Sequence, residues 1–189
     1  SDTFEQVAED QFSSYIDKED FKIIDRKELM YMMPTIWRRL YRKDFLSSNN
    51  INFFTELKRF DDLPFQFLVL LHANTMAFVG GPAYNYRLER QGQDVAIDDA
   101  RLFVHLEIFE ILRAEVEARG IQTGWEVLER IARSTHQWGL ERIRPSLRTE
   151  YTQRAEACNA KTIALCDKLR GTWRSRLSDF FRYHKRFKR

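Results

Sequence analysis

The chain has 189 residues, 43% of them hydrophobic, and its 31 basic and 28 acidic side chains give a formal net charge of +3. This length and composition predict one or two folded domains with a buried core, and they exclude a wholly disordered chain. With only seven glycines, four prolines and two cysteines, the sequence is neither collagen-like nor that of a disulfide-stapled secreted domain. It also contains no apolar run of the about 18 residues that a bilayer-spanning helix needs.

Apolar residues recur at helical intervals over much of the first sixty positions. They predict an amphipathic helix over residues 3–16, with acidic residues on its other face. A second helix is predicted from Asp25, which is an N-cap residue with a glutamate three positions later, to Pro34, which ends it. Helical spacing resumes over residues 35–45, and after a polar loop a short helix is predicted over residues 53–60.

A strongly apolar segment over residues 64–79 begins with a proline and is followed by Gly-Gly-Pro. Proline at the start and glycine at the end are typical boundaries of a helix. Because this helix is apolar on nearly every side, we expect it at the centre of the fold. Leu68, Leu71 and Phe78 are expected to be buried there.

Two further helices are predicted from their end signals. Asp98 is expected to cap a helix that runs from about Asp99 to Arg119 and is closed by Gly120. Thr123, with a glutamate three positions later, is expected to begin another helix, whose end is marked by Pro145.

The last segment has the most regular pattern. Apolar or small residues recur every three or four positions, which predicts one continuous helix of about forty residues, roughly 60 Å long. Gly171 is its weak point and costs about 1 kcal/mol relative to alanine. Such a helix is longer than a compact domain of this size usually contains, so we expect its far end to project or to pack on a partner. The stripe consists of Leu147, Tyr151, Ala155, Cys158, Thr162, Leu165 or Cys166, Leu169, Trp173, Leu177, Phe180, His184 and Phe187.

Together these elements predict an all-α fold, with a single compact domain of six to eight helices and a long basic C-terminal helix. The predicted division is a helical core domain over residues 1–146 and a long amphipathic helix over residues 147–189. This helix is expected to pack on the core or to project from it. No alternation of apolar and polar residues is long enough to predict a β-strand.

Cysteines and histidines show no spacing typical of a reactive or metal site. Cys158 and Cys166 lie about 12 Å apart along the predicted helix, which is too far for a disulfide, so we expect two buried free thiols. His72 and His105 lie in apolar helices and are interpreted as hydrogen-bonded core or boundary residues. Because metal-binding, phosphate-loop and nucleophile motifs are missing, we expect no catalytic residue, no metal, no cofactor and no small-molecule substrate.

One pair of residues points to a different class of protein. Arg130 is followed by His136 on a predicted helix, and some small helical ribonucleases use an arginine and a histidine at such a spacing. Six helical residues rotate by about 600°, which leaves the two side chains about 120° apart. We therefore interpret Arg130, Arg133 and His136 as parts of a solvated helix face and keep a small helical ribonuclease as a minor alternative.

Basic residues concentrate at the C-terminal end. Residues 142–189 carry fourteen basic and four acidic side chains, a balance of +10, whereas residues 1–30 carry four basic and nine acidic ones, a balance of −5. Arginine and lysine neutralise phosphates, and exposed aromatic rings stack on unpaired bases. The candidate binding residues are Lys168, Arg170, Trp173, Arg174, Arg176, Phe181, Arg182, Lys185, Arg186, Lys188 and Arg189, with Lys161 nearby.

This basic, aromatic helix predicts a non-enzymatic, cytoplasmic helical module of a larger assembly that contacts nucleic acid. Basic amphipathic helices also enter grooves of partner proteins and lie on anionic membranes. The alternatives are therefore a module for protein interaction or self-association, and a membrane-proximal cytoplasmic module of a membrane-anchored assembly, with peripheral membrane contact. The helix can also pair with the acidic N-terminal segment of its own chain.

Overall fold

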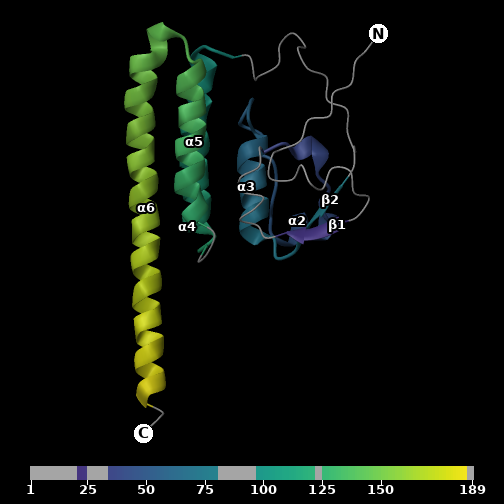
Figure 1. Ribbon diagram of the computed structural model, residues 1–189, viewed down its shortest axis with the longest axis vertical. Coiled ribbons are helices and arrows are strands. Elements are labelled where there is room, and N and C mark those ends of the chain that lie inside the picture. Colours follow the sequence, from purple (N-terminus) through teal and green to yellow (C-terminus); the bar gives the residue numbers. More distant parts are fainter. Residues whose placement is uncertain (1–20, 25–33, 81–96, 122–124, 187–189) are drawn as a thin grey trace. The chain divides into compact units, whose positions relative to one another are not determined.

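The computed structural model describes residues 21–24, 34–80, 97–121 and 125–186 (Figure 1). These residues are mostly helical and include one small sheet of two strands. The chain divides into two compact units, residues 1–96 and residues 97–189. The predicted all-α class is thus confirmed in outline, whereas the described residues form five α-helices and do not confirm the predicted six to eight.

The first unit contains the sheet. Its elements are β1 (Phe21–Ile24), the 3-10 helix η2 (Ile36–Arg38), α2 (Lys43–Ser48), α3 (Asp62–His72) and β2 (Met76–Val79). The two strands pair antiparallel, with Phe21 opposite Val79 and Ile24 opposite Met76. We predicted no strand, because these four-residue segments are too short to show alternation and depend on backbone hydrogen bonds to a distant segment.

The core helix of the first unit is α3, as the apolar segment predicted. Its residues 64–71 are all buried, and Leu68 and Leu71 expose 1% and 6% of their surface. The helix nevertheless ends before Ala73, which has an extended backbone conformation. Phe78 lies on β2 and is only half-buried, so its predicted burial within a helix is wrong.

Between β1 and α3 the chain is less helical than predicted. Over residues 35–45 only η2 and the start of α2 are helical, because Arg39 and Arg42 have extended backbone angles. The helix predicted over residues 53–60 is wrong, since these residues form turns and Phe60 has a positive φ of 54°. Tertiary burial outweighs local helical spacing here.

Three predicted features lie outside the described residues. These are the helix over residues 3–16, most of the helix that begins at Asp25, and the capping residue Thr123.

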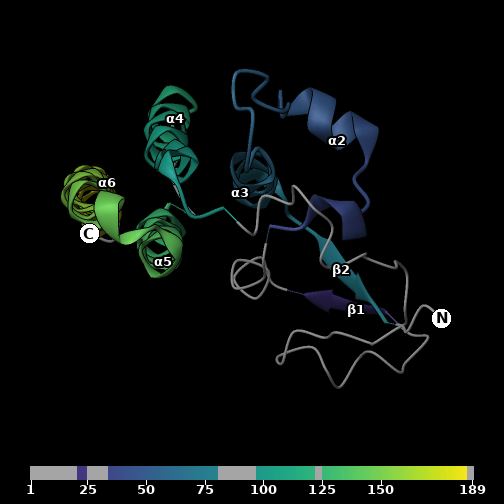
Figure 2. The same cartoon turned by 90° about the horizontal axis from the view of Figure 1, so that it is seen from above.

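Three helices form the second unit, and within it each helix runs antiparallel to the one before it. They are α4 (Val104–Ala118), α5 (Glu126–Arg142) and α6 (Pro145–Arg186), and α4 follows the 3-10 helix η4 (Ala100–Phe103). Figure 2 shows the three helices at the corners of a triangle, with α6 packed against both α4 and α5. Fully buried side chains from each helix fill the space between them. Among those with 0% exposure are Ile108, Phe109, Leu112, Val116, Leu128, Ala132 and Tyr151.

Polar caps fix the ends of these helices. Asp99, rather than the predicted Asp98, caps η4, because its carboxylate accepts the backbone N–H of Arg101 at 3.0 Å. Asp98 instead pairs with Arg144 between α5 and α6, at 2.7 Å between carboxylate and guanidinium. Gly120 ends α4 with a φ of 60°, as predicted.

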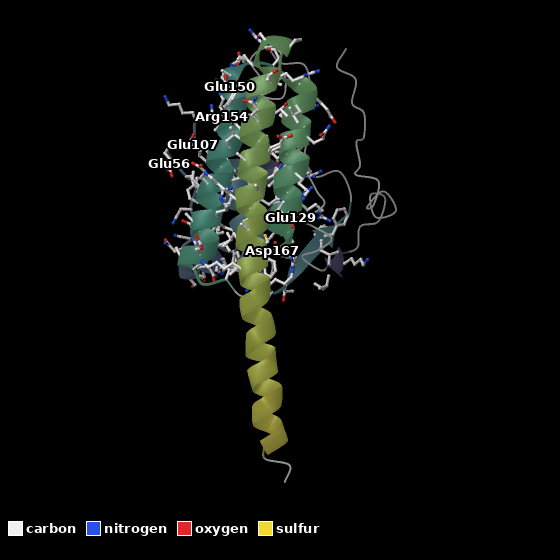
Figure 3. The ribbon with its side chains drawn as sticks, turned by 90° about the vertical axis from the view of Figure 1, so that its left-hand side faces the viewer. Glu56, Glu107, Glu129, Glu150, Arg154 and Asp167 are labelled. Atoms are coloured by element: carbon white, nitrogen blue, oxygen red, sulfur yellow. The ribbon has the colours of Figure 1, made fainter. Side chains whose placement is uncertain are left out.

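The long C-terminal helix is confirmed as α6, whose 42 residues span about 63 Å. Because α4 has 15 residues and α5 has 17, α6 extends well past both of them (Figure 3). The boundary predicted between residues 146 and 147 falls in the first turn of α6, inside the second unit. The predicted stripe is buried at Tyr151, Ala155, Cys158, Thr162, Leu165 and Cys166.

Candidate functional site

The helix α6 has a packed part and a projecting part. The packed part ends beside Trp125, whose carbonyl lies 3.8 Å from Cys166 Sγ and whose ring lies 5.6 Å from the Arg170 guanidinium. One residue later, a Cβ added to Gly171 would meet nothing within 4 Å. Residues 171–186, about 24 Å of helix, therefore project beyond the other two helices of the unit, as Figure 3 shows.

The first candidate binding residues lie on the packed part and pair with carboxylates of their own unit. Lys168 Nζ lies 2.9 Å from the carboxylate of Glu117 on α4, and Arg170 pairs with Asp167, which is labelled in Figure 3. Nearby Lys161 lies 3.6 Å from Glu110. These pairs are exposed, so each contributes at most about 1 kcal/mol and can exchange its partner. Two of the eleven candidate residues, Lys168 and Arg170, are thus already paired with carboxylates of their own unit.

The remaining candidates follow along the projecting part. Arg174, Arg176, Arg182, Lys185 and Arg186 are in the helix, as are Trp173 and Phe181, whereas Lys188 and Arg189 lie outside the described residues. At 3.6 residues per turn, positions 174, 182, 185 and 186 fall within about 120° of arc. Positions 173, 177, 180 and 184 fall within about 60° on another side, in line with the buried stripe of the packed part. The sequence of the projecting part therefore places four basic positions on one side of the helix and the aromatic, apolar positions on another.

A polar cluster lies buried among the three helices of the packed region. His105 and His136 each expose only 1% of their surface. His105 Nδ1 lies 3.1 Å from the Tyr151 hydroxyl, and His136 Nδ1 lies 2.9 Å from Asn159 Oδ1. Burial lowers the pKa of both histidines, that of His105 to about 4, so both rings are neutral at pH 7.

Arg113 extends this cluster toward the surface between α4 and α6. Its Nη1 donates to Thr162 Oγ1 at 3.1 Å and to Cys158 Sγ at 3.3 Å. Thr162 in turn donates to the carbonyl of Cys158 at 3.0 Å. The nearby guanidinium also contributes to the lowered pKa of His136. These contacts tie α4 to α6 and give the cluster a structural role.

The interpretation of His136 as part of a solvated helix face is wrong. Its ring is buried against Phe109, with the ring centroids 5.1 Å apart, whereas Arg133 on the same helix is exposed and pairs with Glu129 at 3.0 Å. No local pattern could place His136, because its partner Asn159 lies on another helix. An acid–base residue must reach its substrate, so this geometry does not favour the ribonuclease alternative.

His105 and the two cysteines lie as the sequence predicted. His105 is a hydrogen-bonded core residue, and His72 is half-buried at the end of α3. Cys158 and Cys166 are both buried and free. Within the described ranges, no three His, Cys, Asp or Glu side chains are grouped so that they could hold a metal ion. None of the helices in these ranges combines the length and the apolar character needed to cross a bilayer.

Comparison of the chain with family models, with curated proteins and with solved structures gave no match. A functional conclusion therefore depends on the residues themselves, above all on the projecting part of α6.

Proposed function

We propose that this protein is a non-enzymatic helical module of a larger assembly and that it contacts nucleic acid through the projecting part of α6. The observation that carries this proposal is the continuation of α6 for residues 171–186 beyond the helices that pack on its first part. A helix that only completed the three-helix core would have no need of these four extra turns.

The charge of the projecting part supports a polyanionic ligand. Residues 171–186 contain five basic residues and one acidic residue, Asp179, which gives a net charge of +4. Four of the basic positions share one face, so they can follow a row of phosphates. Trp173 and Phe181 add aromatic rings that can stack on unpaired bases. Lys168 and Arg170 extend the basic surface if they exchange their carboxylate partners for phosphate.

A protein partner is the second candidate function. It is favoured by the apolar stripe, which continues at positions 173, 177, 180 and 184 where the neighbouring helices have ended. An amphipathic helix of this kind can dock its apolar face in the groove of another protein or against a second copy. Under this alternative, and under peripheral membrane contact, affinity for oligonucleotides is not expected.

Fluorescence anisotropy with labelled single- and double-stranded oligonucleotides tests the proposal. We expect binding that weakens steeply between about 50 and 200 mM salt, because bound phosphates release counterions. Changing Arg174, Arg182, Lys185 and Arg186 together to alanine should weaken binding. It should also flatten the salt slope by up to about 0.9 per lost duplex contact, or about 0.7 for single strands.

A matched control removes the same charge from the packed region. The control variant changes Arg133, Arg142, Arg148 and Arg154 to alanine, all of which are exposed. If net charge alone attracts nucleic acid, both quadruple variants will lose affinity equally and the assignment to the projecting part is wrong. If the wild-type chain binds neither oligonucleotide at the lower salt concentration, the nucleic-acid function is wrong and the protein-partner alternative remains.

We also propose a reducing, cytoplasmic location, which two buried free thiols support. Cys158 and Cys166 lie on one continuous helix, so an internal disulfide between them would require α6 to bend sharply. Reducing agent should leave the melting temperature unchanged. An intramolecular disulfide found by mass spectrometry in the purified protein would contradict both the helix and the proposed location.

A further inference from the structure

A hollow of about 320 Å³ lies between α4 and the packed part of α6. The described residues that line it are Arg113, Glu117, Lys161, Ala164, Leu165 and Lys168. Basic side chains of both helices therefore meet around one hollow. Like charges at short range repel each other unless anions lie between them, so the carboxylates nearby decide how well this charge is balanced.

The guanidinium of Arg113 is held in position by neutral groups. Its Nη1 donates to Thr162 Oγ1 at 3.1 Å and to Cys158 Sγ at 3.3 Å. The side chain exposes only 11% of its surface, so its charge is largely removed from water, which is costly without a close anion. Its Nη2 lies 3.9 Å from the Glu110 carboxylate, which is too far for a hydrogen bond. Nη2 is therefore able to donate to a closer anion.

Two cations share one carboxylate beside the hollow. Lys161 Nζ lies 3.6 Å from Glu110 Oε1, the same oxygen that lies 3.9 Å from Arg113 Nη2. In the part of the chain that the structure describes, neither cation has another ion pair. Glu110 and Lys161 are both exposed, so water screens their attraction. One shared and distant carboxylate thus balances the charge of Arg113 and Lys161 only in part.

The hollow lies in line with basic positions of the projecting part. At 3.6 residues per turn, positions 161, 168, 182 and 186 of α6 fall within about 60° of arc. All four positions are basic, and Asp179 is an acidic residue in the same arc. From position 161 to position 186 this row is roughly 38 Å long at 1.5 Å per residue. A nucleic-acid strand that follows the row from the projecting part is led to the hollow.

We propose that this hollow is a phosphate site, in which Arg113 Nη2 and Lys161 Nζ together contact one phosphate of a nucleic-acid backbone. The inference rests on the proposed nucleic-acid function and extends its interface onto the packed part of α6. A phosphate oxygen within hydrogen-bond distance of the guanidinium makes a stronger, charge-assisted bond than the carboxylate at 3.9 Å. Contacts to the backbone carry no sequence information, so single strands and duplexes are both expected to use the site.

Anisotropy with the full chain and labelled single- and double-stranded oligonucleotides tests the inference. Glu110→Gln removes the carboxylate that competes with the phosphate, so affinity should rise about 2- to 5-fold at low salt. Lys161→Gln should weaken binding and flatten the salt slope by about 0.9 for a duplex or 0.7 for a single strand. Both side chains are exposed, so both variants should remain folded.

Matched controls make the same change in charge at other exposed positions. Glu107, which is labelled in Figure 3, lies one turn before Glu110 on α4, and Glu107→Gln should leave the affinity unchanged. Lys58→Gln in the first unit should leave the salt slope unchanged.

A variant of the buried cation tests the role of its fork. Arg113→Lys keeps the positive charge but has one nitrogen, which cannot both hold Thr162 and reach the phosphate, so affinity should fall. Because Arg113 also ties α4 to α6, melting curves of this variant will show whether the fold is retained. If it unfolds, Glu110→Gln and Lys161→Gln still decide the inference.

The outcomes distinguish the phosphate site from the proposed function. If Glu110→Gln and Lys161→Gln bind as the wild type does while the quadruple variant of the projecting part loses affinity, the phosphate site is wrong and the proposed function stands. Equal gains of affinity in Glu107→Gln and Glu110→Gln would also overturn the site, because net charge would then explain both. If Lys161→Gln loses affinity while the quadruple variant does not, the site stands and the assignment to the projecting part is wrong. If the wild-type chain binds no oligonucleotide, both proposals fail together.

Discussion

The packed and projecting parts of α6 carry the same helical pattern in different surroundings. In residues 145–170 the apolar stripe is buried against α4 and α5, and Tyr151, Asn159 and Thr162 beside it hydrogen-bond to side chains of those helices. In residues 171–186 the stripe continues along the same side of the helix after both neighbours have ended. The comparison teaches that periodicity identifies the helix, whereas the ends of its neighbours decide which part of it is packed in the core and which part extends beyond them.

Two glycines show the same contrast at single positions. A Cβ added to Gly139 on α5 would lie 2.3 Å from the hydroxyl oxygen of Tyr151, so the missing side chain makes room for that ring. A Cβ added to Gly171, the first residue of the projecting part of α6, would have no neighbouring atom within 4 Å. Glycine inside a helix costs about 1 kcal/mol relative to alanine, and only at Gly139 does packing explain this cost.

The largest expected effect distinguishes a core aromatic residue from a projecting one. Tyr151 is fully buried, so Tyr151→Ala should lower the free energy of unfolding by about 3–5 kcal/mol through loss of packing. Trp173→Ala on the projecting part should change it by less than about 0.5 kcal/mol. Urea unfolding of both variants measures the difference. A large loss of stability in Trp173→Ala would mean that the projecting stripe is packed after all.

Acid should weaken the packed region through its buried histidines. Burial lowers the pKa of His105 from 6.5 to about 4, so the unfolded chain binds a proton that the folded chain excludes. The stabilising contribution is therefore complete above about pH 6.5 and is lost as the pH falls toward 4, which amounts to roughly 3 kcal/mol.

Urea unfolding at pH 7 and near pH 4.5 measures this dependence, with His105→Gln as the matched variant. The variant keeps a neutral, hydrogen-bonding side chain but cannot titrate, so its stability should fall less over this range. His136, whose pKa is also lowered, should account for part of the remaining slope. Parallel pH profiles of wild type and variant would show that His105 is not excluded from solvent as described.

Gly139→Ala should lower the free energy of unfolding by about 1–3 kcal/mol, because the new methyl group collides with a ring that has no free space. Tyr151→Phe in the same background removes the oxygen that makes the closest contact, at 2.3 Å, and should recover part of this loss. The double-mutant cycle measures the coupling. Additive effects would indicate that the two residues do not touch.

Gly171→Ala is expected to have the smallest effect on the free energy of unfolding, and it should raise this free energy, whereas Gly139→Ala should lower it. With nothing to collide with, the substitution should stabilise the helix by about 0.5–1 kcal/mol and raise helical content by circular dichroism. Affinity for nucleic acid should stay the same or rise, because a more rigid projecting part loses less entropy on binding. A destabilised variant would show that Gly171 is needed for a bend or a close contact.

Local pattern was sufficient for the helices of the second unit and insufficient for much of the first unit. The helix end at Gly120 and the spacing of the α6 stripe depend on residues within one or two helical turns, so the sequence was enough to predict them. The strands β1 and β2 and the turns over residues 53–60 could not, because each depends on contacts with segments distant in the sequence. The same limit applies to Phe53, because its ring stacks on Phe65 with centroids 4.2 Å apart and this contact gave no signal in the sequence.

The sequence by itself determined the helical class, the long basic helix and the two unbridged cysteines, because periodicity, charge and spacing are properties of neighbouring residues. Only the tertiary structure decided that His136 is buried beside Asn159, that Lys168 is already paired with Glu117, and that α6 leaves its neighbours near Gly171. Each of these outcomes depends on where the neighbouring helices end or on which side chains of two helices meet. Burial and pairing are properties of contacts between segments, and a single linear pattern does not contain them.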